Sequence, residues 1–283
     1  MVIDFHTHTY PPKLASVIKA QLSAPKGLLS FTDGTAAGLE DACIKNDVEK
    51  CVVLPIVSNP VRANKDNRHA AELNEKGGRL ISFGGIHPDN EDYREILTGL
   101  ANEGFIGIKL HPVFQRVDFD DIRYKRIVDF ACEKGLLVSV HAGLDVNDPD
   151  AYYASVPHVR NLLMDVKPER IVLAHMGGHL SWDEAEDMLT EYLAVAPSGS
   201  SVYLDTAFCL PSPVASQNIV RNFLSNEQFV RITRLVGADH VLFGTDSPWT
   251  DQGPAMDAIK NSGLTEKEIS RILYENAKDL LDK

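Results

Sequence analysis

Two histidines near the start of the chain, His6 and His8, have the spacing that most directly suggests chemistry. They come directly after a segment that contains Val2, Ile3 and Phe5, residue types that favour a β-strand. Because side chains alternate across a strand, His6 and His8 point to the same face. Two converging imidazoles can share one metal ion, at about 2.0–2.1 Å per Zn–N bond. The same pair also occurs by chance in sheets, so a metal site needs partners from elsewhere in the chain.

Other residues capable of binding metal or moving protons stand at the ends of later apolar runs. These residues are His87, Lys109, His111, His141, His175 and Asp246. Taken singly, each histidine is best explained as a hydrogen-bonded residue at a strand end. Chance placement would scatter the ten histidines, however, and most of them gather at one end of the predicted strands. We therefore expect one shared site, built where the strands end.

The elements that must position these residues are short runs rich in Val, Ile, Leu and Phe. Such runs are typical of strands that are buried on both faces of a parallel sheet. The predicted strands are Val2–His6, Lys50–Pro55, Leu80–Ile86, Phe105–Leu110, Leu136–His141, Arg170–His175, Ser201–Thr206 and His240–Thr245. Between them lie amphipathic stretches of helical period, such as 121–134 and 183–195.

Alternating strands and helices of this number predict an α/β protein with the (β/α)8 TIM-barrel architecture. The barrel gathers the carboxyl ends of its strands on one rim, where active sites are built. A doubly wound open sheet is the alternative, but the Gly-x-Gly-x-x-Gly turn typical of it is absent. The segment 9–35 is long for a first connection, so we predict a lid-like insertion with a short helix over 14–22. A capping box at Thr265 predicts an extra C-terminal helix over 266–281.

Composition sets the remaining limits. The chain has 283 residues, 44% of them hydrophobic, and no linker or change of composition divides it, which predicts a single domain spanning 1–283. A net charge of −12 argues against nucleic acid and membrane surfaces as partners. Four scattered cysteines and the lack of a signal or long apolar segment predict a cytoplasmic protein.

Five motifs, taken in order, make a family resemblance specific. They are Asp4-Phe5-His6-Thr7-His8, Gly107-Ile108-Lys109-Leu110-His111-Pro112, Val140-His141, Ala174-His175-Met176-Gly177-Gly178 and Gly244-Thr245-Asp246-Ser247-Pro248. Together they resemble the amidohydrolase superfamily of metal-dependent TIM-barrel hydrolases. The resemblance points to the amidohydrolase-related branch that includes aminocarboxymuconate semialdehyde decarboxylase, and it runs over nearly the whole chain.

The resemblance implies a role for each matching position. His6, His8, His141 and Asp246 would be the ligands of one divalent metal ion. His175 would stand beside it as general base or electrostatic partner and share the catalytic role with Asp246. Imidazole and carboxylate ligands suit Zn²⁺ best, with Mn²⁺ or Fe²⁺ as alternatives. Many amidohydrolases instead carry a carbamylated lysine that bridges two metals, and Lys109 stands where it could do so. In the branch resembled here that lysine is usually not a ligand, so we expect one metal.

Five residues are candidates for substrate binding. His87 and His111 each precede a proline at a strand end, Lys109 shares its strand with His111, and Trp249 follows the Asp246 motif. Arg116 lies in a predicted loop and could recognise a carboxylate through its bidentate geometry. The structural alternative for each is a rim, core or solvated loop residue.

Two reactions fit this set of residues. The first is metal-dependent hydrolysis of a small-molecule ester, lactone or amide, with His175 and Asp246 managing the proton of a metal-activated water. The alternative is metal-dependent, non-oxidative decarboxylation of a small unsaturated or aromatic carboxylic acid. A third hypothesis, a barrel that binds a ligand without turnover, is disfavoured because every expected polar position is filled. The partner is a small molecule in each case, and the family association also suggests a homodimer.

Overall fold

The computed structural model describes residues 1–23, 28–199, 201–210 and 223–282. Strands and helices alternate along these residues, and neighbouring strands pair in parallel, as expected of an α/β protein. The chain divides into two compact units. The terminal unit contains Met1–Val53, Gly77–Ile81 and Asp205–Lys283, and the central unit contains Leu54–Lys76 and Ser82–Leu204. The prediction of one domain over the whole chain stays a prediction.

The terminal unit is built around β1. Every residue of β1 is buried, and β2 pairs with it in parallel, with Asp4 opposite Cys51. The N–H of Phe5 donates to the carbonyl of Phe243 over 2.7 Å, which sets the segment after β9 alongside β1. The strands of this unit are β1 (Ile3–Thr7), β2 (Lys50–Val53), β3 (Leu80–Ser82), whose last residue belongs to the central unit, and β9 (Val241–Leu242). Its helices are α1 (Pro12–Ser23), α2 (Ala36–Lys45), α9 (Asn226–Val236), α10 (Gln252–Lys260), α11 (Glu266–Ser270) and α12 (Asn276–Leu281).

The structure has helices in both segments predicted as additions to the barrel, the insertion after the first strand and the C-terminal helix. α1 contains the helix expected within the insertion after the first strand, although residues 24–27 of that insertion lie outside the described residues. Its action as a lid stays a prediction. The C-terminal helix begins at the Thr265 capping box and continues through a π-helical segment, Arg271–Glu275, into α12.

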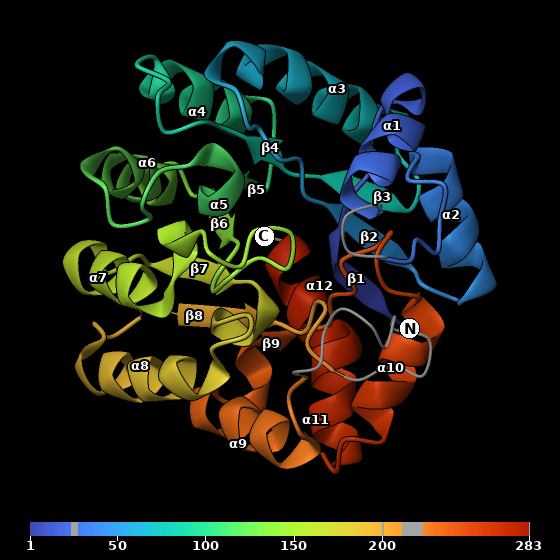
Figure 1. Cartoon of the computed structure of the whole chain (residues 1–283), viewed down its shortest axis with the longest axis vertical. Helices are drawn as coiled ribbons and strands as arrows, with labels where there is room; N and C mark the ends of the chain where they lie inside the picture. Colours follow the sequence, from blue (N-terminus) through green and yellow to red (C-terminus); the bar gives the residue numbers. More distant parts are fainter. Residues whose placement is uncertain (24–27, 200, 211–222, 283) are drawn as a thin grey trace. The chain divides into compact units, whose positions relative to one another are not determined.

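In the central unit, strands β4 to β8 follow one another in spatial order. Figure 1 shows α4, α6, α7 and α8 following one another along the outer side of β5 to β8. The strands are β4 (Gly84–Gly85), β5 (Gly107–Leu110), β6 (Leu137–Val140), β7 (Arg170–Leu173) and β8 (Ser201–Asp205), the last of which ends in the terminal unit. The helices are α3 (Ala63–Lys76), α4 (Tyr93–Asn102), α5 (Pro112–Gln115), α6 (Ile122–Glu133), α7 (Val156–Val166) and α8 (Trp182–Val195).

One predicted strand differs from the structure. The run Leu80–Ile86 forms two short strands, β3 and β4, which belong to different sheets. Glycine weakens a strand because it has no side chain to pack. At Gly84 and Gly85 neighbouring side chains fill that space instead, since a Cβ at Gly84 would lie 2.7 Å from Leu100.

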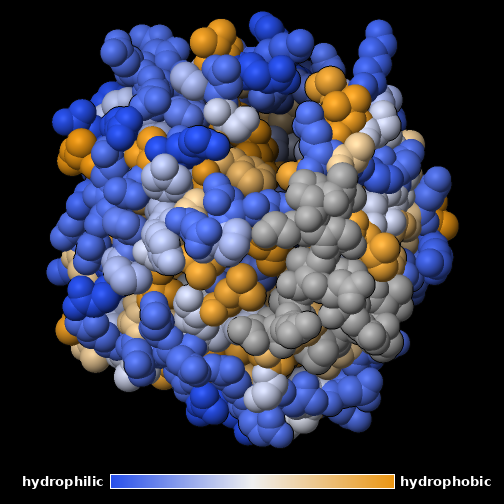
Figure 2. Space-filling view, in the orientation of Figure 1, coloured by the Kyte–Doolittle hydropathy of each residue, from blue (hydrophilic) through white to orange (hydrophobic). Residues whose placement is uncertain are grey.

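The surface fits the acidic, polar composition. Figure 2 shows hydrophilic residues over most of the described surface on this face, with apolar residues in small groups. Among the described residues, no helix is both long and apolar enough to cross a membrane.

Candidate metal centre

Three of the four predicted metal ligands meet in the terminal unit. The Nε2 atoms of His6 and His8 lie 3.2 Å apart, and Oδ1 of Asp246 lies 3.0 Å from His8 Nε2 and 3.6 Å from His6 Nε2. Two nitrogens on a tetrahedral Zn²⁺, each about 2.0–2.1 Å from the ion, would be separated by roughly 3.3 Å. The observed separations therefore fit a shared divalent ion.

Asp246 is held in place by its backbone. Its N–H donates to the carbonyl of His6 over 2.8 Å, and its carbonyl accepts from the N–H of Trp249. Asp246 has a φ of 64°, a left-handed conformation that is uncommon outside glycine and that often marks a functional site. The Asp246 side chain stays 18% exposed, so solvent or substrate can reach it.

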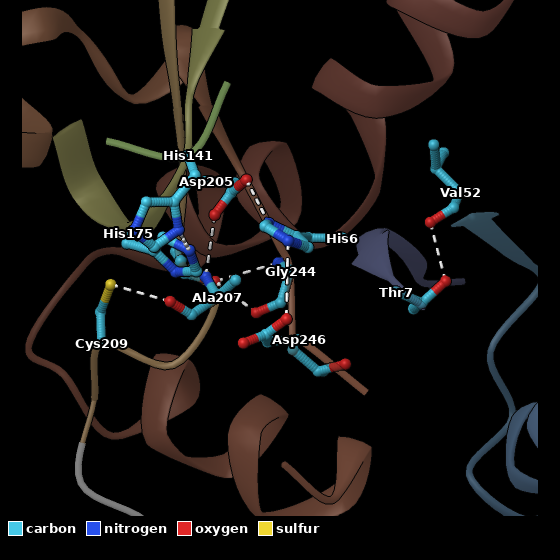
Figure 3. Close-up of polar contacts among 12 residues, drawn as sticks. His6, Thr7, Val52, His141, His175, Asp205, Ala207, Cys209, Gly244 and Asp246 are labelled. Atoms are coloured by element: carbon cyan, nitrogen blue, oxygen red, sulfur yellow. Dashed lines mark hydrogen bonds and ion pairs between the residues drawn. The ribbon is translucent and has the colours of Figure 1, made fainter. Parts of the chain in front are cut away.

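Asp205 is a member of this site that the sequence analysis missed. It is fully buried at the end of β8, and its Oδ2 lies 2.8 Å from Nδ1 of His6. Figure 3 shows the His6 ring between Asp205 and Asp246. The signal was present in the sequence, because Asp205 lies near the end of a predicted strand. Its spacing alone does not distinguish it from a carboxylate that faces solvent, because its contact with His6 joins segments 199 residues apart.

Asp4 joins the two segments that carry the predicted metal ligands His6 and Asp246. It accepts hydrogen bonds from the backbone N–H and the hydroxyl of Thr245, from Nε2 of Gln252 and from the N–H of His6. Complete burial outweighs these bonds and raises the pKa of Asp4 to about 7.

Tyr10 is a second residue near the site that the sequence did not reveal. Burial, reinforced by the charge of Asp246, raises the pKa of the Tyr10 phenol. A phenol already keeps its proton at neutral pH, so this shift only strengthens its preference for the protonated, hydrogen-bond-donating form.

In the central unit, the predicted fourth ligand and the predicted base contact one another. Nδ1 of His141 lies 3.0 Å from Nε2 of His175, and both rings are buried. Figure 3 shows the two rings pointing toward each other. His141 Nε2 lies 3.2 Å from the carbonyl of Leu144, which can only accept, so that nitrogen carries the proton. Nδ1 of His141 therefore carries the lone pair, which faces Nε2 of His175 in this structure.

His175 is oriented by its backbone as well. It follows β7 with a φ of 57°, and its carbonyl accepts a 3.0 Å hydrogen bond from Nε1 of Trp182. Trp182 is buried at the start of α8.

The comparisons with known proteins identify the family. A model of the amidohydrolase family matches residues 3–283. The chain belongs to the amidohydrolase family. The predicted family resemblance is confirmed, and this amidohydrolase is a metal-dependent enzyme of that superfamily. Among curated proteins, none matches the chain by sequence.

Solved structures similar to this amidohydrolase match it over nearly its whole length. A TIM-barrel protein from Bordetella bronchiseptica is 17% identical with a TM-score of 0.72, covering 99% of this chain and 98% of its own. The structure of 5-carboxyvanillate decarboxylase from Sphingomonas paucimobilis is 14% identical with a TM-score of 0.68, and the match covers 99% of this chain and 98% of that one. A dihydroxybenzoic acid decarboxylase from Polaromonas sp. JS666, with bound manganese and 2-nitroresorcinol, is 16% identical with a TM-score of 0.70. That match covers 99% of this chain and 96% of the decarboxylase. At these identities the likeness shows the fold alone, and it confirms the predicted TIM-barrel class.

Two of the predicted substrate-binding residues of this amidohydrolase lie close to His141. Lys109 is buried in β5, next to Ser139 of β6 in register. The ring of His111 stacks on the ring of His141 at 4.3 Å, and its Nε2 lies 3.8 Å from Asp145. The N–H of Phe114 donates to Nδ1 of His111, so Nε2 carries the proton and is not the lone-pair atom a metal requires. His111, His141 and Asp145 nevertheless form a group whose ligand atoms lie within 4.8 Å of one another, and substrate binding by His111 stays a prediction.

The other three predicted substrate-binding residues differ in their surroundings. Nδ1 of His87 accepts a hydrogen bond from the N–H of Asp89, and burial lowers the pKa of this histidine. Both observations fit a structural residue at the strand end. Arg116 is exposed at the end of α5. Trp249 is buried, with its backbone bonded to Asp246. A substrate contact by any of them stays a prediction.

Proposed function

We propose that this amidohydrolase is a metal-dependent, non-oxidative decarboxylase of a small aromatic or unsaturated carboxylic acid. One observation carries the choice of reaction. Two similar structures that are named for a reaction, 5-carboxyvanillate decarboxylase and dihydroxybenzoic acid decarboxylase, match this chain over 99% of its length. The motifs and the geometry of His6, His8 and Asp246 are consistent with that reaction. Hydrolysis, the first hypothesis from the sequence, is the second candidate.

We propose that His6, His8 and Asp246 hold one divalent cation, with His141 as the fourth ligand expected from the sequence. Imidazole nitrogen and carboxylate oxygen suit Zn²⁺, Mn²⁺ and Fe²⁺. Manganese in the Polaromonas decarboxylase makes Mn²⁺ the first ion to test beside Zn²⁺. A divalent cation bound here would polarise the oxygens of the bound acid.

A side chain of the protein would donate one proton to the substrate. In decarboxylation, the ring or alkene carbon that bears the carboxylate gains a proton, the carbon–carbon bond breaks, and CO₂ leaves. We assign the proton to His175, because an imidazole exchanges protons near neutral pH. The hydrogen bond from Trp182 to its carbonyl holds the His175 backbone, and in this structure its Nε2 lies 3.0 Å from Nδ1 of His141. Solvent then returns the proton to His175.

Hydrolysis would use the same groups differently. His175 and Asp246 would accept the proton of an attacking water, and the products would carry the elements of that water instead of releasing CO₂. Small molecules are the proposed substrates in both cases, and a carboxylate is the group we expect Arg116 or His111 to recognise.

The test is a direct comparison of the two reactions. Protein loaded with Mn²⁺ or with Zn²⁺ is incubated with hydroxybenzoic, methoxybenzoic and dienoic acids, and separately with esters, lactones and anilides. We expect CO₂ release from an acid and, in D₂O, one deuterium on the carbon that lost the carboxylate. Hydrolysis of the second group without CO₂ release from the first would overturn the proposal. Chelator-treated protein is the control and should be inactive.

A further inference from the structure

We propose that Asp205 is a positioning residue for His6, which sets the imidazole nitrogen offered to the metal ion without being a ligand itself. The proposal rests on the proposed metal centre and deepens it. Asp205 is 0% exposed, and its Oδ2 lies 2.8 Å from His6 Nδ1. Its other oxygen, Oδ1, accepts from the N–H of Ala207 over 3.1 Å.

The consequence for His6 follows from the chemistry of the two groups. A neutral imidazole has one nitrogen that donates and one that accepts, and a carboxylate can only accept. The short contact with Asp205 therefore requires the proton of His6 on Nδ1. The lone pair of Nε2 is left facing His8 Nε2 at 3.2 Å and Asp246 Oδ1 at 3.6 Å. These are the distances at which a shared ion would be held.

The segments around Asp205 and Asp246 are tied together. The hydroxyl of Thr206 donates to the carbonyl of Gly244 and accepts from its N–H, at 3.2 and 3.1 Å. Gly244 also lies close against the histidine, since a Cβ there would be 2.8 Å from the Cβ of His6. The His6 side chain is therefore confined between a fixed carboxylate and a fixed backbone.

An aspartate suits this position better than an asparagine. Both of its carboxylate oxygens face donors, the N–H of Ala207 and Nδ1 of His6. An amide has only one oxygen, so Asn would turn its NH₂ group toward one of the two donors. The negative charge of Asp205 also makes the imidazole a stronger base, which strengthens its bond to a metal.

The chain offers a matched control. Asp120 makes the same kind of contact with a different histidine, since its Oδ1 lies 2.7 Å from Nδ1 of His158. Neither residue belongs to the predicted metal ligands or substrate-binding residues. Asp120→Asn therefore removes one aspartate–histidine pair of similar geometry and leaves the metal centre intact.

The experiment measures metal affinity and the protonation of His6 without turnover. Dissociation constants for Mn²⁺ and Zn²⁺ are measured by competition with a chromophoric chelator for wild type, Asp205→Ala, Asp205→Asn and Asp120→Asn. Circular dichroism establishes that each variant is folded. We expect affinity to fall about 10- to 100-fold for Asp205→Ala, as for other residues that orient metal ligands, and to stay unchanged for Asp120→Asn.

Nitrogen-15 NMR of metal-free wild type supplies a readout that a purely structural role would not move. With the His6 signals assigned through their loss in His6→Gln, we expect the proton on Nδ1 at pH 8. A proton on Nε2 would overturn the proposal, as would unchanged affinity in a folded Asp205→Ala variant. If that variant does not fold, the wild-type spectrum decides alone. Neither measurement depends on decarboxylation, so a wrong reaction leaves this inference intact.

Discussion

The hydroxyl of Thr245 donates a 2.7 Å hydrogen bond to Asp4, and this bond joins the segment that carries Asp246 to the strand that carries His6. The backbone N–H of Thr245 donates to the other oxygen of Asp4 over 3.0 Å. Two segments 241 residues apart in the sequence, each of which carries a proposed metal ligand, are thus held together directly.

Asp4 should make the metal-free protein less stable as the pH rises. Its pKa is about 7 when folded, against 3.8 as the ordinary value. The folded state therefore keeps a proton that the unfolded state has lost, and the resulting stability, present below pH 3.8, disappears as the pH rises through 7. At about 1.36 kcal/mol per pKa unit, the loss is at most about 4 kcal/mol. Urea midpoints of chelator-treated protein at pH 5 and pH 8 capture the part of the loss above pH 5, about two of these units or about 3 kcal/mol.

Asp4→Asn should weaken that pH dependence, because an amide does not titrate. Asp129, which is exposed on α6, provides the control, and Asp129→Asn should keep the wild-type difference between the two pH values. Equal pH dependence in Asp4→Asn and wild type would show that another group is responsible.

Loss of a metal ligand should remove the metal. We expect His8→Ala and Asp246→Asn each to lower affinity for Mn²⁺ and Zn²⁺ by more than about 100-fold, since even residues outside the coordination shell cost 10- to 100-fold. Metal content after dialysis, measured by mass spectrometry, checks this. His69→Ala, at a half-exposed position on α3, should bind metal as wild type does. Full metal occupancy in both ligand variants would refute the site.

His175→Ala should separate catalysis from metal binding. Removing a general acid or base costs about 10²- to 10⁴-fold in rate, while the proposed ligands stay in place. The rate of decarboxylation and the metal content are measured on the same sample. His158→Ala, which removes a partly buried histidine on α7, is the control. An unchanged rate with His175 absent would exclude it as the proton donor.

Gly244→Ala should disturb His6 through direct contact. The new Cβ would lie 2.8 Å from the Cβ of His6, so the histidine must move away from its present position. We expect weaker metal binding, by about 10-fold or more, as for displacement of an orienting group. Gly99→Ala is the matched control, because a Cβ there meets nothing within 4 Å. Within helix α4 it should stabilise the protein by about 0.5–1 kcal/mol. Wild-type metal affinity in Gly244→Ala would contradict the prediction.

Much of the fold could be predicted from periodicity alone. Short β-branched runs alternate with amphipathic stretches, and every predicted strand has a counterpart among the described residues. The division of Leu80–Ile86 into β3 and β4 escaped prediction, because hydropathy does not show where a strand changes its partner. The capping box at Thr265 was predictable because its hydrogen bonds are local.

The site shows the same difference between local and distant information. The sequence by itself determined that His6 and His8 share a strand face, because alternation is a property of the backbone. It also placed Asp246 at a strand end. Only the tertiary structure decided that Asp205 approaches Nδ1 of His6 and that buried Asp4 accepts a hydrogen bond from Thr245. Such contacts depend on how distant segments pack and on which polar groups lose water together, and no spacing in the sequence records either.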